Sequence, residues 1–468
     1  MKNKVFNILV VGSGLSSLTF IDSYLEKNKK IDVISFNKSK KNFSQINNNH
    51  ILKILPPQMI GEEKQVNDYF SLNKISIDSK TNFFGSMEFG GLSNYWGLQI
   101  DKNILNDILY LSKNTQKKIL KSFIEIFNKN KLLGEINNKT KNLFKKDSYI
   151  DENLLKKDKV LKVDEPLLAF QKSTISKKRI NLNSINEKKE KFVPKNFFKN
   201  NLKKNKIKFH NYFVEKIENH KNGIMLRCSN GTEKKIFTTK KLVLACGTLI
   251  TTKLIMDYLK VAEEVKINHH PRLFSVYFSK KKWKNNMNFQ PSHFHLKLKK
   301  LPSLFTADFR PGNKIIIDAI IKFKIILTPF KLFLNIVREH LIFSNIFLNP
   351  KYGNLYIKKK KNIFTVYSKK KNDDKFFKKL GKLIYNFLVK SKKILPLYIN
   401  YFPGYGADFH YFGTILMGKS QKLSVNEKCQ LNKNKKIYVV DGSVLNFKTN
   451  KYPLGLIMAN SRRVGKEI

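Results

Sequence analysis

A glycine-rich loop near the N-terminus is the first group of residues whose types and spacing could do chemistry. Gly12-Ser13-Gly14-Leu15-Ser16-Ser17 fits the pattern GxGxxG with serine in the third glycine position. In this pattern the first glycine makes a sharp turn, the second lets the backbone approach a pyrophosphate, and a small third residue lets helix and strand pack closely. A mostly apolar run (5–11) precedes the loop, and helical spacing (18–29) follows a turn over 12–17. The loop therefore predicts a dinucleotide site at a helix N-terminus, built by Gly12, Gly14 and Ser17.

The second strand of this unit ends without the acidic residue that usually binds the ribose hydroxyls. Residues 31–36 read IDVISF, so Ser35 occupies that place. We expect Ser35 to make a weaker hydrogen bond to the adenosine half of the ligand. No pocket for a 2′-phosphate is evident in the sequence.

Histidine is the second residue type that could do chemistry. His410 is the last of nine histidines and lies in a stretch of aromatic and small residues. Its ordinary pKa, about 6.5, suits proton transfer near neutral pH. The alternative interpretation is a core histidine that only packs against aromatic rings. The pair His269-His270 is a poor metal site because adjacent strand residues point to opposite faces, so we predict a structural role for the pair and no metal site.

Two further stretches match a known family in the order that the family has them. Residues 90–97 read GGLSNYWG, and residues 409–418 read FHYFGTILMG, followed by VVDGS (439–443) and KYPLGLIMAN (451–460). Together with the Gly12 loop, they resemble the glucose-methanol-choline (GMC) flavoprotein oxidoreductases. The resemblance covers mostly the flavin domain, and residues 137–200 and 271–400 match nothing in it.

The resemblance implies FAD rather than NAD. It implies non-covalent FAD, because Tyr95 stands where some relatives carry a histidine that bonds to the flavin. The residues that fall on cofactor-binding positions are Gly12, Gly14 and Ser17 at the pyrophosphate, Gly90, Gly91, Ser93 and Asn94 around the flavin, Val214 at the adenine, and Asp441 and Gly442 near the ribityl and isoalloxazine end.

The resemblance also implies a reaction: oxidation of a CH–OH group in an alcohol, polyol or sugar-like substrate, with His410 as the base. The second catalytic position falls on Tyr452, and a small shift would bring in Asn450 instead. A phenol with a pKa of about 10 is a poor base near neutral pH. Two alternatives stay open: a flavoprotein of another class, such as an amine oxidase or a reductase, or a non-catalytic relative that binds a glycan, a membrane or a nucleic acid.

The expected fold class is α/β, with a discontinuous FAD-binding Rossmann-like domain and a second domain of a sheet plus helices for the substrate. The predicted ranges are 1–110, 205–272 and 400–468 for the first domain, and 111–204 and 273–399 for the second. Strands are expected within 207–239, 241–246, 293–320, 354–367 and 437–440, and helices over 104–133 and 454–464. Residues 137–200 read as a variable insertion.

The composition is strongly basic. Among 468 residues, 90 are Lys or Arg and 35 are Asp or Glu, a net charge of +55. The excess is nearly all lysine and is scattered along the chain, which favours a solvated surface over a specific nucleic-acid partner. Three cysteines without a CxxC exclude a disulfide scaffold and a cysteine-based zinc site.

The run 325–348 is interrupted by Pro329 and by charges. It is therefore expected as a helix under a sheet, with a basic helix resting on a membrane surface as the alternative. We expect a cytoplasmic protein, with weak contact to an anionic membrane surface as an additional expectation. Its partner is expected to be a small-molecule or glycan-linked alcohol, and the sequence leaves the electron acceptor open.

Overall fold

The structure is a computed structural model of the 468-residue chain. The residues that it describes are 4–36, 51, 55–56, 59, 61–101, 104–129, 132–133, 159–164, 167–171, 191–280, 282, 292, 294–312, 314, 317–318, 321, 329–369, 374–390, 394–450 and 452–468. Most of the predicted insertion at 137–200 lies outside these ranges.

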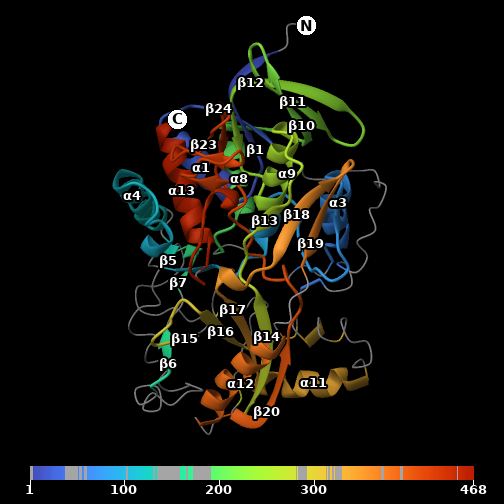
Figure 1. The fold of residues 1–468 in the computed structure, drawn as a ribbon, viewed down its shortest axis with the longest axis vertical. Coiled ribbons are helices and arrows are strands. Elements are labelled where there is room, and N and C mark those ends of the chain that lie inside the picture. Colours follow the sequence, from blue (N-terminus) through green and yellow to red (C-terminus); the bar gives the residue numbers. More distant parts are fainter. Residues whose placement is uncertain are drawn as a thin grey trace.

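The larger half is built on a ten-stranded sheet whose centre is parallel (Figure 1). Strands β24, β12, β1, β2 and β9 pair in parallel in that order, as in a Rossmann-like unit. Their apolar runs suit burial on both faces. The strands are β1 (Val5–Val11), β2 (Ile31–Ile34), β9 (Ile207–His210), β10 (Phe213–His220), β11 (Gly223–Ser229), β12 (Lys234–Leu244), β21 (Leu416–Met417), β22 (Ser424–Val425), β23 (Gln430–Leu431) and β24 (Asn434–Val439).

Helices from both ends of the chain cover this sheet (Figure 1). The first and last helices pack closely, because a side chain at Gly465 would collide with the Phe20 carbonyl oxygen and the Ser23 hydroxyl. This contact brings the N-terminal loop and the C-terminal residues together. The helices of this half are α1 (Leu15–Tyr24), α4 (Lys113–Lys129), α8 (Pro194–Lys203), α9 (Thr248–Tyr258) and α13 (Leu454–Glu467).

The second half is a six-stranded antiparallel sheet. Its order is β20-β14-β17-β16-β15-β6, and α12 packs against one face through an apolar cluster that includes Tyr277, Phe309 and Ile384. The opposite face turns toward the larger half and forms part of a cavity described below. The elements are β6 (Leu161–Asp164), β14 (Arg272–Ser279), β15 (Phe294–Leu298), β16 (Phe305–Pro311), β17 (Leu341–Leu348), β20 (Ile394–Tyr401), α11 (Lys331–Val337) and α12 (Asp374–Lys390).

Smaller ladders connect the two halves. A four-stranded sheet runs in the order β13-β18-β19-β3, and two short ladders pair β4 with β7 and β5 with β8. The remaining elements are α3 (Glu63–Leu72), β3 (Ile75–Ile77), β4 (Gln99–Ile100), β5 (Leu132–Leu133), β7 (Leu167–Leu168), β8 (Phe170–Gln171), β13 (Val265–Ile267), β18 (Leu355–Lys360), β19 (Ile363–Ser368), and the short 3₁₀ helices η2 (Gly91–Asn94), η3 (Leu105–Asp107), η7 (Arg338–His340), η8 (Pro350–Tyr352) and η9 (Gly442–Val444).

The predicted α/β class and its two-part architecture are confirmed. The domain ranges stay a prediction; β18 and β19 come from the range assigned to the substrate domain, yet they pair with β13 and β3.

Three local predictions were wrong in detail. The first helix begins at Leu15, directly after Gly14, and ends at Tyr24 before a charged run. Residues 104–133 hold η3, α4 and β5 rather than one helix. The expected helix at 325–348 contains β17, a strand inside the six-stranded sheet.

Candidate active site

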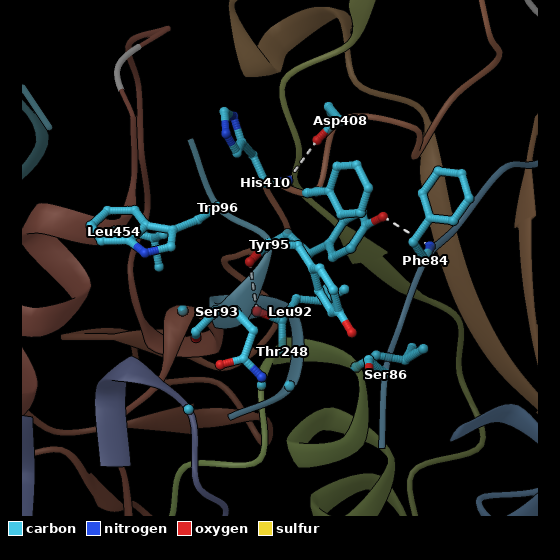
Figure 2. Close-up of a pocket in the computed structure, with 18 of the residues that line it drawn as sticks. Phe84, Ser86, Leu92, Ser93, Tyr95, Trp96, Thr248, Asp408, His410 and Leu454 are labelled. Atoms are coloured by element: carbon cyan, nitrogen blue, oxygen red, sulfur yellow. Dashed lines mark hydrogen bonds between the residues drawn. The ribbon is translucent and has the colours of Figure 1, made fainter. Parts of the chain in front are cut away.

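One continuous cavity of about 1470 Å³ joins the N-terminal glycine loop to His410. Its lining contains both sets of residues that the sequence marks for chemistry, although the chain separates them by almost its whole length. Figure 2 shows His410 and Asp408 in this cavity, together with Ser93, Tyr95 and Trp96 from the second glycine loop. Of the predicted site residues, the lining includes Gly12, Gly14, Ser35, Gly90, Gly91, Ser93, Asn94, Val214, His410, Asp441, Gly442 and Tyr452.

The first glycine loop is held in place by close backbone approach. Gly12 has φ +114°, and a side chain there would lie 2.2 Å from the carbonyl oxygen of Ala245, directly after β12. Only glycine tolerates both conditions. Ser17 does not line the cavity; it is fully buried in α1. Its small side chain serves the close packing of the helix, as the motif predicts for its third position.

Serine hydroxyls join the two glycine loops. The Ser13 hydroxyl accepts hydrogen bonds from the Gly90 amide at 2.9 Å and from the Ser35 hydroxyl at 2.8 Å. The Ser93 hydroxyl accepts a hydrogen bond at 3.1 Å from the Leu15 amide, at the N-terminus of α1. These bonds hold the second loop against the end of the helix where an anion would be stabilised.

The second glycine loop is a tight turn with one unsatisfied polar atom. Gly90 and Gly91 both have positive φ, and a side chain on Gly90 would collide with Asn94. The Asn94 amide nitrogen donates to Glu88 and to the Phe89 carbonyl oxygen, but its Oδ1 atom is buried without a hydrogen-bond partner among the described residues. A ligand with an N–H group could satisfy this oxygen.

The remaining predicted cofactor residues lie on different walls of the same cavity. Val214 is buried at the start of β10, where the pairing with β11 is irregular. Asp441 follows β24 and caps η9; its carboxylate accepts hydrogen bonds from the amide and hydroxyl of Ser443 and from the Thr251 hydroxyl. Burial raises the pKa of Asp441.

The His410 ring is packed by aromatic side chains from both halves. Phe347 of β17 stacks on it, with centroids 4.7 Å apart and planes inclined by 26°. The Tyr452 ring meets it edge-on at 5.7 Å. Phe409, the residue before it, has φ +66°, which is strained for a side chain that is not glycine.

His269 acts on His410 through Asp408, and His270 contacts the His410 ring directly. The Asp408 carboxylate accepts from the His269 ring Nδ1 at 2.6 Å. It also accepts from the His410 backbone amide at 2.9 Å (Figure 2). The His269 Nε2 atom accepts a hydrogen bond from the Asn354 amide, so the proton of a neutral His269 sits on Nδ1, facing Asp408. The neighbouring His270 contacts the His410 ring itself, with 3.2 Å between their Nδ1 atoms.

These contacts determine which nitrogen of His410 carries a proton. The His270 Nε2 atom lies 2.9 Å from the Thr449 carbonyl oxygen, which can only accept, so this nitrogen carries the proton. The Nδ1 atom of a neutral His270 then accepts, and the Nδ1 atom of His410 must donate to it. The Nε2 atom of neutral His410 is left as a proton acceptor, and no described residue hydrogen-bonds to it.

Burial keeps both rings of this pair neutral. Desolvation lowers the pKa of His410 to about 4; Asp408 opposes this effect and Arg272 adds to it. Desolvation and the neighbouring His410 lower the pKa of His270 to about 3. Burial alone would raise the pKa of Asp408, but His269 and His410 outweigh it and hold that pKa below its usual range.

Tyr452 and Asn450 differ in their access to the cavity. The Tyr452 ring lines the cavity, and its hydroxyl lies 3.4 Å from the His295 Nε2 atom. Burial raises the pKa of Tyr452 well above 10, so its hydroxyl can donate a hydrogen bond but cannot act as a base. Asn450 is buried away from the lining and donates to the Thr306 hydroxyl.

The cavity face of the six-stranded sheet supplies polar groups that the sequence did not reveal. The Asp308 carboxylate accepts from the Gln99 amide at 3.1 Å, from the Asn345 backbone amide at 2.9 Å and from Arg310. Arg272 lies on the same face, and its buried Nε atom has no hydrogen-bond partner among the described residues. Oxygen atoms of a ligand could satisfy it.

Sequence reasoning missed the roles of His270, Asp408, Phe347, Arg272 and Asp308. For His270 the sequence predicted only a general structural role, and the pair of adjacent histidines before a proline was the one signal that pointed to it. Trp96 has a dual position: it lines the cavity, and its indole N–H donates to the Phe192 carbonyl oxygen at 3.1 Å.

The described residues contain no group of three or more His, Cys, Asp or Glu side chains arranged to hold a metal ion. Within the described ranges, every helix is too short or too polar to cross a bilayer.

Comparisons with known proteins agree with this architecture at the level of the fold. No protein-family model matches the chain, and no curated protein matches it in sequence. Solved structures do match, among them the crystal structure of pyridoxine 4-oxidase from Mesorbium loti. The TM-score is 0.63 over 99% of both chains, at 10% sequence identity. The chain therefore shares the fold of that oxidase.

Proposed function

We propose that this protein is a GMC-type, FAD-dependent oxidoreductase that oxidises a CH–OH group, with His410 as the base. The observation that carries the proposal is the single cavity in which the Gly12 loop and the ring of His410 meet. The shared fold with an enzyme named as an oxidase supports an oxidoreductase. The family motifs in the sequence support the flavin and the alcohol donor.

The residues around the cavity fit FAD in three respects. Gly12 and Gly14 leave room beside the N-terminus of α1, where a side chain on Gly14 would lie 3.3 Å from the Ser93 hydroxyl oxygen. The unsatisfied Asn94 Oδ1 atom offers an acceptor to an N–H group of the ring. Ser35 and Val214 line the cavity where the adenosine half would lie.

Tyr95 is not a nucleophile here, because its hydroxyl donates a hydrogen bond to Glu88 at 2.6 Å and burial raises its pKa, so we propose non-covalent binding.

Bound flavin supplies the hydride acceptor, and the protein supplies the proton acceptor and the orientation. The neutral His410 ring takes the substrate hydroxyl proton at its Nε2 atom. Asp408, which bonds the His410 backbone, favours the imidazolium that results. The Tyr452 hydroxyl donates a hydrogen bond to the substrate oxygen and thereby orients it.

A cyclic polyol or a sugar-like alcohol is the substrate class that we propose. Such a molecule presents several oxygen atoms to polar groups and one flatter face to aromatic rings. The cavity offers both, with Arg272, Asp308 and Asn345 as polar partners and Phe274 and Phe347 as apolar ones. Water exclusion by these rings would strengthen the polar contacts.

The experiment is anaerobic titration of the purified protein with alcohols. We expect a yellow protein that releases FAD on denaturation, and bleaching of its flavin absorbance by a polyol or sugar at neutral pH. A colourless protein that takes up no added FAD would contradict the proposal. Bleaching by amines or by NADPH, but by no alcohol, would assign the protein to another flavoprotein class.

A further inference from the structure

Two neighbouring elements of the second half expose large apolar side chains to solvent. On α11, Leu332 is 79% exposed and Ile336 is 75% exposed, and Phe333 lies between them at 60%. On β20, Leu397 is 54% exposed and Ile399 is 55% exposed. Both elements lie at the end of the molecule opposite the N-terminus (Figure 1). Clusters of exposed large apolar residues usually mark a surface that is covered in the working protein.

The register of the six-stranded sheet places these side chains beside one another. Ile399 is directly opposite Val276 of β14, and Val276 is directly opposite Phe343 of β17, so the three share one face. Leu334 of α11 packs against the cluster that Val276 and Phe343 form. The inner side of α11 therefore covers the same face of the sheet that β20 leaves open at its edge.

This apolar surface borders the candidate active site. Ile399, Val276 and Phe343 line the cavity that contains His410, as does Tyr401, the last residue of β20. Ile399 and Tyr401 are thus exposed and also contribute to the cavity wall. Whatever covers the surface would lie at this wall of the cavity.

The charge of the protein identifies the occupant. A net charge of +55 opposes the association of two copies of the chain and favours an anionic surface. Basic side chains accompany the apolar ones, since Lys331 is exposed beside Leu332 and Arg338 follows directly after α11. Asp318 faces Lys331 at 3.7 Å and Glu339 stands next to Arg338, so the attraction to an anionic surface comes from the net charge of the whole chain. Exposed apolar side chains on a strongly basic protein suit the interface of an anionic bilayer.

We propose that α11 and the exposed edge of β20 form a docking surface for an anionic lipid membrane, against which the cavity of His410 opens. The surface binds the bilayer interface without crossing it. It would give a membrane-borne alcohol direct access to the cavity, a consequence that rests on the proposed function, whereas the docking itself does not.

Co-sedimentation of the purified full-length protein with vesicles tests the docking. The probes are vesicles of phosphatidylcholine alone and of phosphatidylcholine with 30% phosphatidylglycerol, at physiological salt. We expect binding to the anionic vesicles only. The variant Leu332→Ser/Phe333→Ser/Ile336→Ser should lower the partition coefficient at least about tenfold, because it removes the side chains that enter the interface. A second variant, Leu395→Ser/Leu397→Ser, tests the β20 edge independently.

A matched control removes three exposed apolar side chains elsewhere. Leu109, Ile124 and Ile236 are 56%, 59% and 50% exposed, and their triple change to serine should leave binding intact. Cooperative thermal unfolding would verify that each variant is folded. Equal binding by the α11 variant and the control, or no binding by the unaltered protein, would overturn the proposal. So would a dimer by sedimentation equilibrium that the α11 variant converts to monomer, since a second copy would then be the occupant. Flavin reduction is not a readout here, so failure of docking leaves the proposed reaction untouched.

Discussion

The Nδ1 atoms of His270 and His410 lie 3.2 Å apart, and the far side of His270 is anchored to the Thr449 carbonyl oxygen at 2.9 Å. The hydrogen bonds between these two rings and Thr449 leave the Nε2 atom of His410 as the proton acceptor. His270 thus acts through His410, as a positioning residue for the proposed base.

Replacement of His270 separates positioning from packing. His270→Leu should lower the rate of flavin reduction by about 10-fold or more, because the His410 ring loses the acceptor that fixes its tautomer. His270→Asn should restore most of the rate, since an amide can accept from His410 and donate to Thr449 at once. Stopped-flow reduction measures both variants. Equal rates in the two variants would mean that His270 only fills space.

His410→Ala should retain FAD and lower the rate of flavin reduction by about 10²–10⁴-fold, the usual contribution of a general base. The measurement is anaerobic reduction at saturating alcohol, with flavin content determined in parallel. A rate equal to that of the unaltered protein would remove His410 from the proposed reaction.

The second catalytic position can be tested by comparing variants of Tyr452 and Asn450. Tyr452→Phe removes only the hydroxyl, which lies near His295, and should reduce kcat/KM by about 10-fold, as expected for the loss of one hydrogen bond of about 1–1.5 kcal/mol. Asn450→Ser, away from the lining, should leave kcat/KM nearly unchanged in the folded protein. The reverse order of effects would assign the role to Asn450.

Gly14→Val should prevent FAD retention. The new side chain would extend beyond a Cβ that already lies 3.3 Å from the Ser93 hydroxyl oxygen, into the space where a pyrophosphate would approach the helix. Gly14→Ala, with only the Cβ, should weaken FAD binding less. The ratio of flavin to protein after gel filtration, determined from absorbance, measures the retention of FAD. Full occupancy in the valine variant would contradict the predicted cofactor position.

The low pKa values of the histidine pair predict two pH dependences. His410 is neutral above its pKa of about 4, so flavin reduction should show no loss from its protonation between pH 5.5 and 8, and should fall as the pH approaches 4. The free energy of unfolding should also fall as the pH is lowered. Both folded-state pKa values lie below the ordinary histidine value of about 6.5. At a pH between the folded-state values and 6.5, the unfolded chain therefore binds more protons than the folded protein.

The contribution of the pair to stability is therefore complete above pH 6.5 and decreases as the pH falls below it. Urea unfolding at pH 5 and pH 7, compared with the same pair of measurements on His270→Asn, tests this. The variant should lose less stability on acidification than the unaltered protein. An equal loss in both proteins would show that His270 is protonated in the folded state.

Local patterns were sufficient for the parts of the fold that depend on neighbouring residues. The apolar run 5–11 became β1, the strands expected within 207–239 and 241–246 became β9, β10, β11 and β12, and residues 454–464 became most of α13. The segment 341–348 was mistaken for helix because a continuous apolar run has no period to distinguish the two. Its neighbours β14 and β16, remote in sequence, supply the hydrogen-bond partners that make it a strand.

The sequence by itself determined the chemistry-bearing residues at the two ends of the chain: the Gly12 loop, the Gly90 loop, His410 and Tyr452. Their residue types and short spacings are sufficient to predict these sites, because a turn or a helix N-terminus forms from adjacent residues. Only the tertiary structure decided that His270 tethers the ring of His410, that Phe347 stacks on it, and that Arg272 and Asp308 share its cavity. Those contacts join segments 63 to 140 residues from His410 along the chain, and strand register, not local pattern, brings them together.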